Sequence, residues 1–114
     1  MLDPLSAKLD HYMTLLSTRQ RIVASNLANT DTPDYKTKDI DFEAEFRRVS
    51  ATPGATAIVN EVPGLRVKND GNNVDIDREA RMLSENTMRF NVASNLLRGQ
   101  LKSIRLAISG GSGQ

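Results

Sequence analysis

The strongest constraint on the fold is a heptad spacing of apolar residues at each end of the chain. Near the N-terminus they recur at alternating intervals of three and four positions, which lines them up along one side of an α-helix. Two polar residues, Arg19 and Asn26, fall on the same line. Its apolar members are Leu2, Leu5, Leu9, Tyr12, Leu16 and Val23. The spacing predicts a helix over residues 4–29 that packs against another helix.

Both edges of this first helix carry boundary signals. Asp3 can accept hydrogen bonds from the first free backbone N–H groups, and Pro4 suits a first-turn position that needs no N–H donor. At the other edge, Asn29 begins a polar run that competes for backbone hydrogen bonds, and Pro33 cannot continue a helix. The predicted helix therefore ends at about residue 29.

The C-terminal part of the chain repeats the heptad spacing. It predicts a helix over residues 78–108, about 45 Å long at the usual rise per residue, with Asp77 as its cap. This helix starts acidic and ends basic, so an antiparallel arrangement would bring Asp3 and Asp10 near Lys102 and Arg105. The predicted seam consists of Leu83, Thr87, Phe90, Ser94, Leu97, Leu101, Ile104 and Ile108.

Residues 30–73, between the two helices, carry no long periodic pattern. A short helix over 42–49 fits the apolar spacing there. The runs at 57–62 and 65–68 fit either a β-hairpin or a segment that is disordered outside an assembly. Turn-forming pairs that contain glycine separate these short runs. We therefore expect an irregular or small-β middle segment.

The chain is predicted to form one domain over residues 1–114 and to be mostly α. Its two long terminal helices are expected to form an antiparallel coiled coil. Residues 109–114, which are rich in Gly and Ser, are expected to form a flexible tail.

Composition indicates that the chain buries part of its surface against partners. It has 3 Phe, 2 Tyr and no Trp. A core formed by this chain alone would be thin, because aromatic side chains supply the largest buried areas. Apolar residues outside the two seams form further faces, which we expect other copies or partner proteins to cover. These residues are Met13, Leu15, Ile22, Leu27, Met82, Met88, Val92, Leu96 and Leu106.

The sequence disfavours several classes of function. A formal net charge of +1 lacks the positive field of a dedicated nucleic-acid-binding protein. The absence of Cys and the single histidine, His11, disfavour thiol chemistry and a zinc site. We find no Gly-rich phosphate loop and no catalytic-triad spacing. We therefore expect no enzymatic activity, no cofactor, no metal ion and no small-molecule substrate.

A run of alternating carboxylates is the main feature that could support catalysis or cation binding. It consists of Asp39, Asp41, Glu43 and Glu45. Basic residues flank the run on both sides. The favoured interpretation is therefore a solvated polar face rather than a site.

The end of the first predicted helix is the most specific segment. Asn26 lies on the helix seam, where a buried amide needs hydrogen-bond partners and so fixes the register of packing. A helix end followed by a turn explains residues 29–33 but not Asn26. The segment contains Ala24, Ser25, Asn26, Leu27, Ala28, Asn29, Thr30, Asp31, Thr32, Pro33 and Tyr35. It resembles the N-terminal signature of bacterial flagellar axial proteins, which include rod, hook and hook-associated subunits.

Three further runs, at residues 38–43, 70–79 and 85–90, are similar to the B-type proximal rod proteins of that family. The chain departs from the family pattern at Asp34, because the family usually has Gly between this proline and tyrosine. Its middle segment is also shorter than is common in the family.

The resemblance implies a structural subunit of the proximal rod, which transmits motor torque across the periplasm. It also implies export by the flagellar type III apparatus without a cleaved signal peptide. The first residues indeed lack the continuous apolar run of a secretory signal. The implied partners are copies of the chain itself, other rod proteins and the adaptor at the membrane ring, with no nucleic acid. The alternative is a coiled-coil adaptor or export chaperone that binds a partner helix.

The seams and the signature together predict the residues of the assembly interface. They are Leu5, Leu9, Tyr12, Leu16, Val23, Asn26, Leu27, Asn29, Leu83, Phe90, Leu97, Leu101, Ile104 and Ile108.

Overall fold

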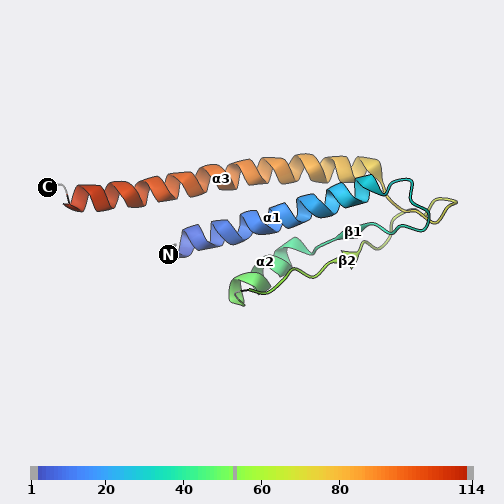
Figure 1. Ribbon diagram of the computed structural model, residues 1–114, viewed down its shortest axis with the longest axis horizontal. Coiled ribbons are helices and arrows are strands. Elements are labelled where there is room, and N and C mark those ends of the chain that lie inside the picture. Colours follow the sequence, from blue (N-terminus) through green and yellow to red (C-terminus); the bar gives the residue numbers. More distant parts are fainter. Residues whose placement is uncertain (1–2, 53, 113–114) are drawn as a thin grey trace.

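Two long helices, one near each end of the chain, form the body of the protein in the computed structural model, which describes residues 3–52 and 54–112 (Figure 1). α1 spans Pro4–Ala28 and α3 spans Ile76–Ser112. They lie side by side and run in opposite directions, and the molecule extends 71 Å along its longest axis and 18 Å along its shortest. The expectation of a mostly α fold is confirmed.

α1 begins and ends where its polar residues satisfy free backbone groups. The carboxylate of Asp3 accepts hydrogen bonds from the backbone N–H groups of Leu5 and Ser6, at 3.2 and 3.3 Å. At the other end Asn29 is the capping residue rather than the last helical one, and its Nδ2 donates to the Ser25 carbonyl at 2.8 Å. The helix is therefore one residue shorter than the predicted 4–29.

α3 is longer than predicted at both ends. It starts at Ile76 because Asp75, not Asp77, caps it, by accepting a hydrogen bond from the Arg78 backbone N–H at 3.2 Å. It continues through Ser112, so residues 109–112 of the expected tail are helical, and residues 113 and 114 lie outside the described part. Gly110 keeps helical backbone and does not adopt the positive φ that ends many helices.

The middle segment contains a short helix and a minimal sheet. β1 (Lys38–Asp39) pairs with β2 (Asn60–Glu61) in antiparallel register, and α2 (Phe42–Ala51) lies between them in the chain. The run at 57–62 thus pairs with the segment before α2 and not with 65–68, so the predicted hairpin between these two runs is wrong. The physical reason is that α2 reverses the chain and brings β2 back beside β1.

α1 is the central element, with α3 on one side and α2 on the other (Figure 1). Tyr12 packs edge-to-face against Phe42 and Phe46 of α2, with ring centroids 5.2 and 5.7 Å apart. Tyr12 was expected on the seam between the two long helices, whereas its ring packs on α2. The most buried apolar residues are Leu15, Leu16, Val23, Ile40, Val74 and Ala93.

Half of the predicted seam of α3 is displaced by one position. A line of buried and half-buried residues runs along this helix at alternating intervals of four and three: Glu79, Leu83, Asn86, Phe90, Ala93, Leu97, Gln100 and Ile104. Thr87, Leu101 and Ile108, which were expected on the seam, are exposed. Polar and small residues take their places, because Asn86 hydrogen-bonds to α1 and Ala93 lets the helices approach closely.

α3 also extends past the start of α1. The Gln100 side chain donates to the Asp3 carboxylate at 3.2 Å, so residues 101–112 lie beyond the first turn of α1 (Figure 1). The hydrogen-bond partner of Asp3 on α3 is thus the neutral Gln100, two residues before Lys102, in place of the expected Lys102 and Arg105. Leu106 and Ile108, in this extension, are 61% and 67% exposed.

Candidate assembly site

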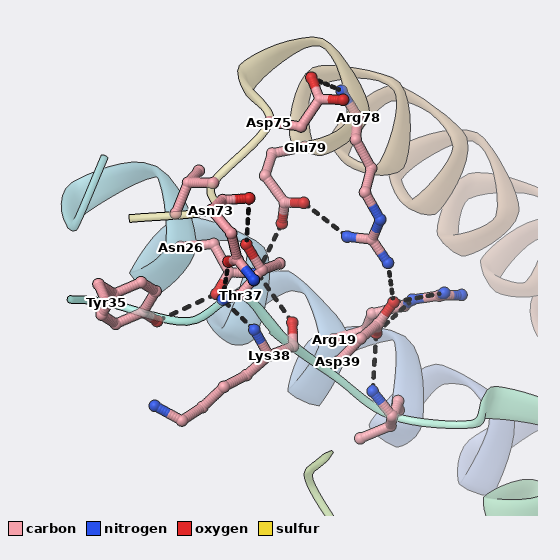
Figure 2. Close-up of polar contacts among 12 residues, drawn as sticks. Arg19, Asn26, Tyr35, Thr37, Lys38, Asp39, Asn73, Asp75, Arg78 and Glu79 are labelled. Atoms are coloured by element: carbon pink, nitrogen blue, oxygen red, sulfur yellow. Dashed lines mark hydrogen bonds and ion pairs between the residues drawn. The ribbon is translucent and has the colours of Figure 1, made fainter. Parts of the chain in front are cut away.

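The signature segment and the run at 70–79 meet where α1 ends and α3 begins (Figure 1). Figure 2 shows the hydrogen bonds and ion pairs that join them. We call this network the polar junction, and it consists of Arg19, Asn26, Tyr35, Thr37, Lys38, Asp39, Asn73, Arg78 and Glu79. The signature segment and the run at 70–79 resemble the same family. The polar junction gives a physical reason why both are present, because each segment supplies hydrogen-bond partners to the other.

Asn26 lies at the centre of the polar junction and is fully buried. Its Nδ2 donates to the Lys38 carbonyl at 2.8 Å and to Glu79 Oε1 at 2.6 Å. Its Oδ1 accepts from the Tyr35 hydroxyl at 3.0 Å and from the Lys38 backbone N–H at 3.1 Å. Because an amide offers two donors and two acceptor positions, Asn26 is fully satisfied and connects α1, β1 and α3.

A chain of charges extends from Asn26 across the junction. Glu79 is fully buried, and its other carboxylate oxygen accepts from Arg78 Nη1 at 2.5 Å. Arg78 Nη2 also donates to Asp39 at 2.8 Å. Arg19 approaches the same carboxylate with two hydrogen bonds of 3.1 Å. Buried carboxylates destabilise a fold unless they are paired, and here each has an arginine partner.

The pairing shifts the pKa values of Asp39 and Arg78 in the direction that keeps each side chain charged. Burial favours the neutral form of Asp39, but the hydrogen bond and charge of Arg19 outweigh it, so the pKa of Asp39 lies below its ordinary value of 3.8. Burial likewise opposes the charge of Arg78, yet Glu79 and Asp39 hold the pKa of Arg78 above its ordinary value. The ion pairs are therefore present at neutral pH.

Two buried asparagines hold the loop that follows α1 in place by hydrogen bonds. Asn72 Nδ2 donates to the carbonyls of Asn29 and Thr32, each at 2.8 Å, at a helix end whose carbonyls have no helical partners. Asn73 Oδ1 accepts from the Thr37 backbone N–H at 2.6 Å. The sequence interpretation placed only a turn and a helix cap here. Two adjacent asparagines between turn and helix were the signal for these contacts.

The turn at Asp34 keeps a left-handed backbone although the residue is not glycine. Its φ is 63°, and its backbone N–H donates to the Asp70 carbonyl at 3.0 Å. Gly71 lies directly against it, because a Cβ at Gly71 would overlap Asp34 Oδ1. Asp34 thus adopts the conformation that favours the glycine usual in the family, at a cost in free energy.

The alternating carboxylates form no common site. Asp39 belongs to the polar junction, Asp41 caps α2, and Glu43 is exposed. Glu45 is buried and accepts hydrogen bonds from Arg48, at 2.7 Å, and from the Ile58 backbone N–H. The solvated-face interpretation is therefore wrong for Asp39 and Glu45. Within the described residues, no group of three or more His, Cys, Asp or Glu side chains is placed to hold a metal ion.

Most of the exposed apolar surface lies on α3. Met88, Val92 and Leu96 are 62%, 54% and 58% exposed. Among the residues predicted for the interface, Leu5, Leu101 and Ile108 are exposed, whereas Leu16, Val23 and Asn26 are buried inside the chain. The remainder are half-buried: Leu9, Tyr12, Leu27, Asn29, Leu83, Phe90, Leu97 and Ile104. In the part of the chain described, no helix is both long and apolar enough to cross a membrane.

Comparison with known proteins places these features in a family. A family model described as flagella basal body rod protein matches residues 13–36, which include most of the signature segment. The flagellar basal body rod protein FlgB of Salmonella typhimurium is 31% identical over 138 positions, covering 98% of this chain and 100% of that protein. Because this alignment is longer than the chain, the Salmonella relative contains residues that this chain lacks.

Two further relatives agree over nearly the whole chain. FlgB of Borrelia hermsii is 33% identical over 129 positions, covering 91% of this chain and 96% of that protein. FlgB of Escherichia coli (strain K12) is 29% identical over 139 positions, covering 98% of this chain and 100% of that protein. The chain therefore belongs to the FlgB family of flagellar basal body rod proteins, which are structural proteins and not enzymes.

Proposed function

We propose that this protein is a subunit of the proximal rod that polymerises through its terminal helices and transmits motor torque across the periplasm. The observation that carries the proposal is the row of apolar side chains on α3, of which Met88, Val92 and Leu96 are more than half exposed. A contiguous exposed apolar face marks an interaction surface. In a rod protein, neighbouring subunits are the partners that would cover it.

The proposal includes the packing of α1 and α3 as an antiparallel coiled coil against helices of neighbouring copies and of other rod proteins. It also includes contact with the adaptor at the membrane ring, and export by the flagellar type III apparatus without a cleaved signal peptide. Long helices suit this role, because side chains along their whole length can contact neighbours. The polar junction supports it by holding the two helices in one register.

Recovery of the protein from purified basal bodies tests the proposal. A strain that lacks the gene is complemented with an epitope-tagged copy, and basal bodies are isolated and probed for the tag. We expect the tagged protein in the rod fraction and swimming in the complemented strain. A protein that stays in the cytosolic fraction while rods form without it would contradict the proposal and favour the coiled-coil adaptor or export chaperone.

A further inference from the structure

Three exposed side chains on α3 form one continuous feature. Met88, Val92 and Leu96 recur every fourth residue, so they stand above one another along the helix. We call them the α3 ridge. Glu85, which is exposed, precedes the ridge by one turn and makes an ion pair with Arg89 at 2.5 Å. The ridge is therefore an apolar strip with a carboxylate at its N-terminal end.

A groove lies between α1 and α3, lined by Leu16 and Gln20 on α1 and by Asn86 and Phe90 on α3. Asn86 is 5% exposed, and its Nδ2 donates to the Leu16 carbonyl at 2.8 Å and to Gln20 Oε1 at 2.9 Å. These two acceptors fix the orientation of the amide. Asn86 Oδ1 is buried and hydrogen-bonds to no described residue. The polar wall of the groove is thus held in place by hydrogen bonds between the two helices.

The ridge and the groove lie on opposite sides of the helix pair. Met88 and Val92 are each two residues from Phe90, and two residues of α-helix turn a side chain by about 200°, which leaves it about 160° away. The ridge instead borders the side of the pair that carries Leu9 and Tyr12. One chain therefore presents an apolar projection on one side and a recess on the other.

We propose that the α3 ridge of one copy docks in the groove between α1 and α3 of a second copy. A projection and a recess on opposite sides of one chain form a heterologous contact, which repeats without closing and builds an open helical assembly. A two-fold contact between two ridges would leave the groove uncovered. The inference rests on the proposed function, because it specifies the surface through which copies in the rod meet.

Charge supports the same pairing when neighbouring copies point in the same direction, as in a polar filament. Asn86 is level with Gln20 across the helix pair, so Glu85 and Arg21 lie at nearly the same height on opposite sides of the molecule. Arg21 is exposed on the rim of the groove. When the ridge docks with little axial offset between copies, Glu85 of one copy lies against Arg21 of the next, a complementary pair that fixes register.

Disulfide cross-linking tests the proposal directly, because the chain contains no cysteine. The double variant with Ser17→Cys in the groove and Met88→Cys on the ridge is assembled into basal bodies and oxidised. We expect a ladder of multimers on non-reducing gels, whereas each single variant stays monomeric. The matched control combines Met88→Cys with Ala51→Cys, an exposed position on α2, and is expected to give no ladder.

Three results would overturn the ridge-and-groove contact. They are dimers from Met88→Cys alone, cross-links whose mass identifies another rod protein, or no excess over the control pair. In each case the protein is still recovered in the rod, so the proposed function stands. Loss of the protein from basal bodies in the unmodified strain would instead contradict the proposed function.

Charge reversal keeps the test decisive if the cysteine variants do not assemble. Glu85→Arg and Arg21→Glu are each expected to reduce swimming roughly tenfold, and the double variant to restore most of it. The matched control is Arg89→Ala, which removes the same internal ion pair as Glu85→Arg and should leave swimming unchanged. Unimpaired single variants, or a double variant that does not recover, would overturn the proposed register.

Discussion

Asn26 and Glu79, 53 positions apart in the chain, share a 2.6 Å hydrogen bond between two fully buried side chains. The bond joins the last turns of α1 to the first turn of α3. An apolar contact there would tolerate sliding of one helix along the other, whereas a fully satisfied amide tolerates only one register. The register of the exposed face of α3 therefore depends on a pair of polar residues that no solvent reaches.

The first prediction concerns Asn26→Leu. The substitution leaves Glu79 Oε1, the Tyr35 hydroxyl and the backbone of Lys38 without their partner in a buried site. We expect the free energy of unfolding to fall by about 3 kcal/mol, measured by urea denaturation, and swimming to be lost. Asn95→Leu, at an exposed position of α3, is the control and should have little effect. Equal denaturation midpoints for wild type and Asn26→Leu would contradict the role of the junction.

The second prediction concerns acid stability. Because the pKa of folded Asp39 is lower than in the unfolded chain, its stabilisation is complete above the ordinary pKa of 3.8 and is lost as pH falls through the folded-state value. We expect Asp39→Asn to reduce the free energy of unfolding at neutral pH by roughly 1–3 kcal/mol, and by less as pH falls below about 4. Denaturant titrations across this range measure it.

The diagnostic quantity in that experiment is the difference in the free energy of unfolding between Asp39→Asn and wild type at each pH. Asp3 and Glu45 also have lowered pKa values, and they contribute to acid loss in both proteins alike. Glu43→Gln, at an exposed carboxylate, is the control and should stay within about 0.5 kcal/mol of wild type at neutral pH. Parallel curves for Asp39→Asn and wild type would refute the stabilising ion pairs.

The third prediction concerns the turn at Asp34. Asp34→Gly removes the cost of a left-handed backbone, and we expect it to raise the free energy of unfolding by about 0.5–1 kcal/mol. Asp31→Gly, where φ is not positive, should instead lower it. In a double-mutant cycle, Gly71→Ala should cost less in the Asp34→Gly background, because the overlap of its Cβ with Asp34 is removed. Additive effects would show that the two residues do not interact.

The fourth prediction tests the shifted seam of α3. Ala93 is 2% exposed, so Ala93→Leu must force α1 and α3 apart, and we expect a loss of about 1–3 kcal/mol in thermal or urea unfolding. Ala80→Leu makes the same change at an exposed position of the helix and should stay within about 0.5 kcal/mol of wild type. A larger effect at Ala80 than at Ala93 would mean that the face is assigned wrongly.

Residue periodicity was sufficient to predict the long helices and the start of α1, because capping and heptad signals act within a few neighbouring residues. It assigned Leu83, Phe90, Leu97 and Ile104 to the inner face of α3, and these residues are half-buried. It missed Asn86 and Gln100, because the heptad spacing selected Thr87 and Leu101. Asn86 instead hydrogen-bonds to α1, and Gln100 to the residue that caps α1.

The polar junction could be predicted only in part. The need of Asn26 for partners followed from its place on the seam, but the partners Glu79 and Lys38 come from distant segments that no local pattern connects. The pairing of β1 with β2 escaped prediction for the same reason, since strands of two residues carry no periodicity. Residue spacing reports only local periodicity. It does not show which distant segments of the chain come together in the fold.

The extension of α3 past Gln100 has a mechanical consequence. Its 101–112 segment adds about 18 Å of single helix beyond the start of α1. In the proposed assembly, this extension would lie alongside a helix of the next subunit, so that the two subunits overlap along their lengths. Load would then be carried as shear over many side-chain contacts along two helices, rather than as tension across one helix end.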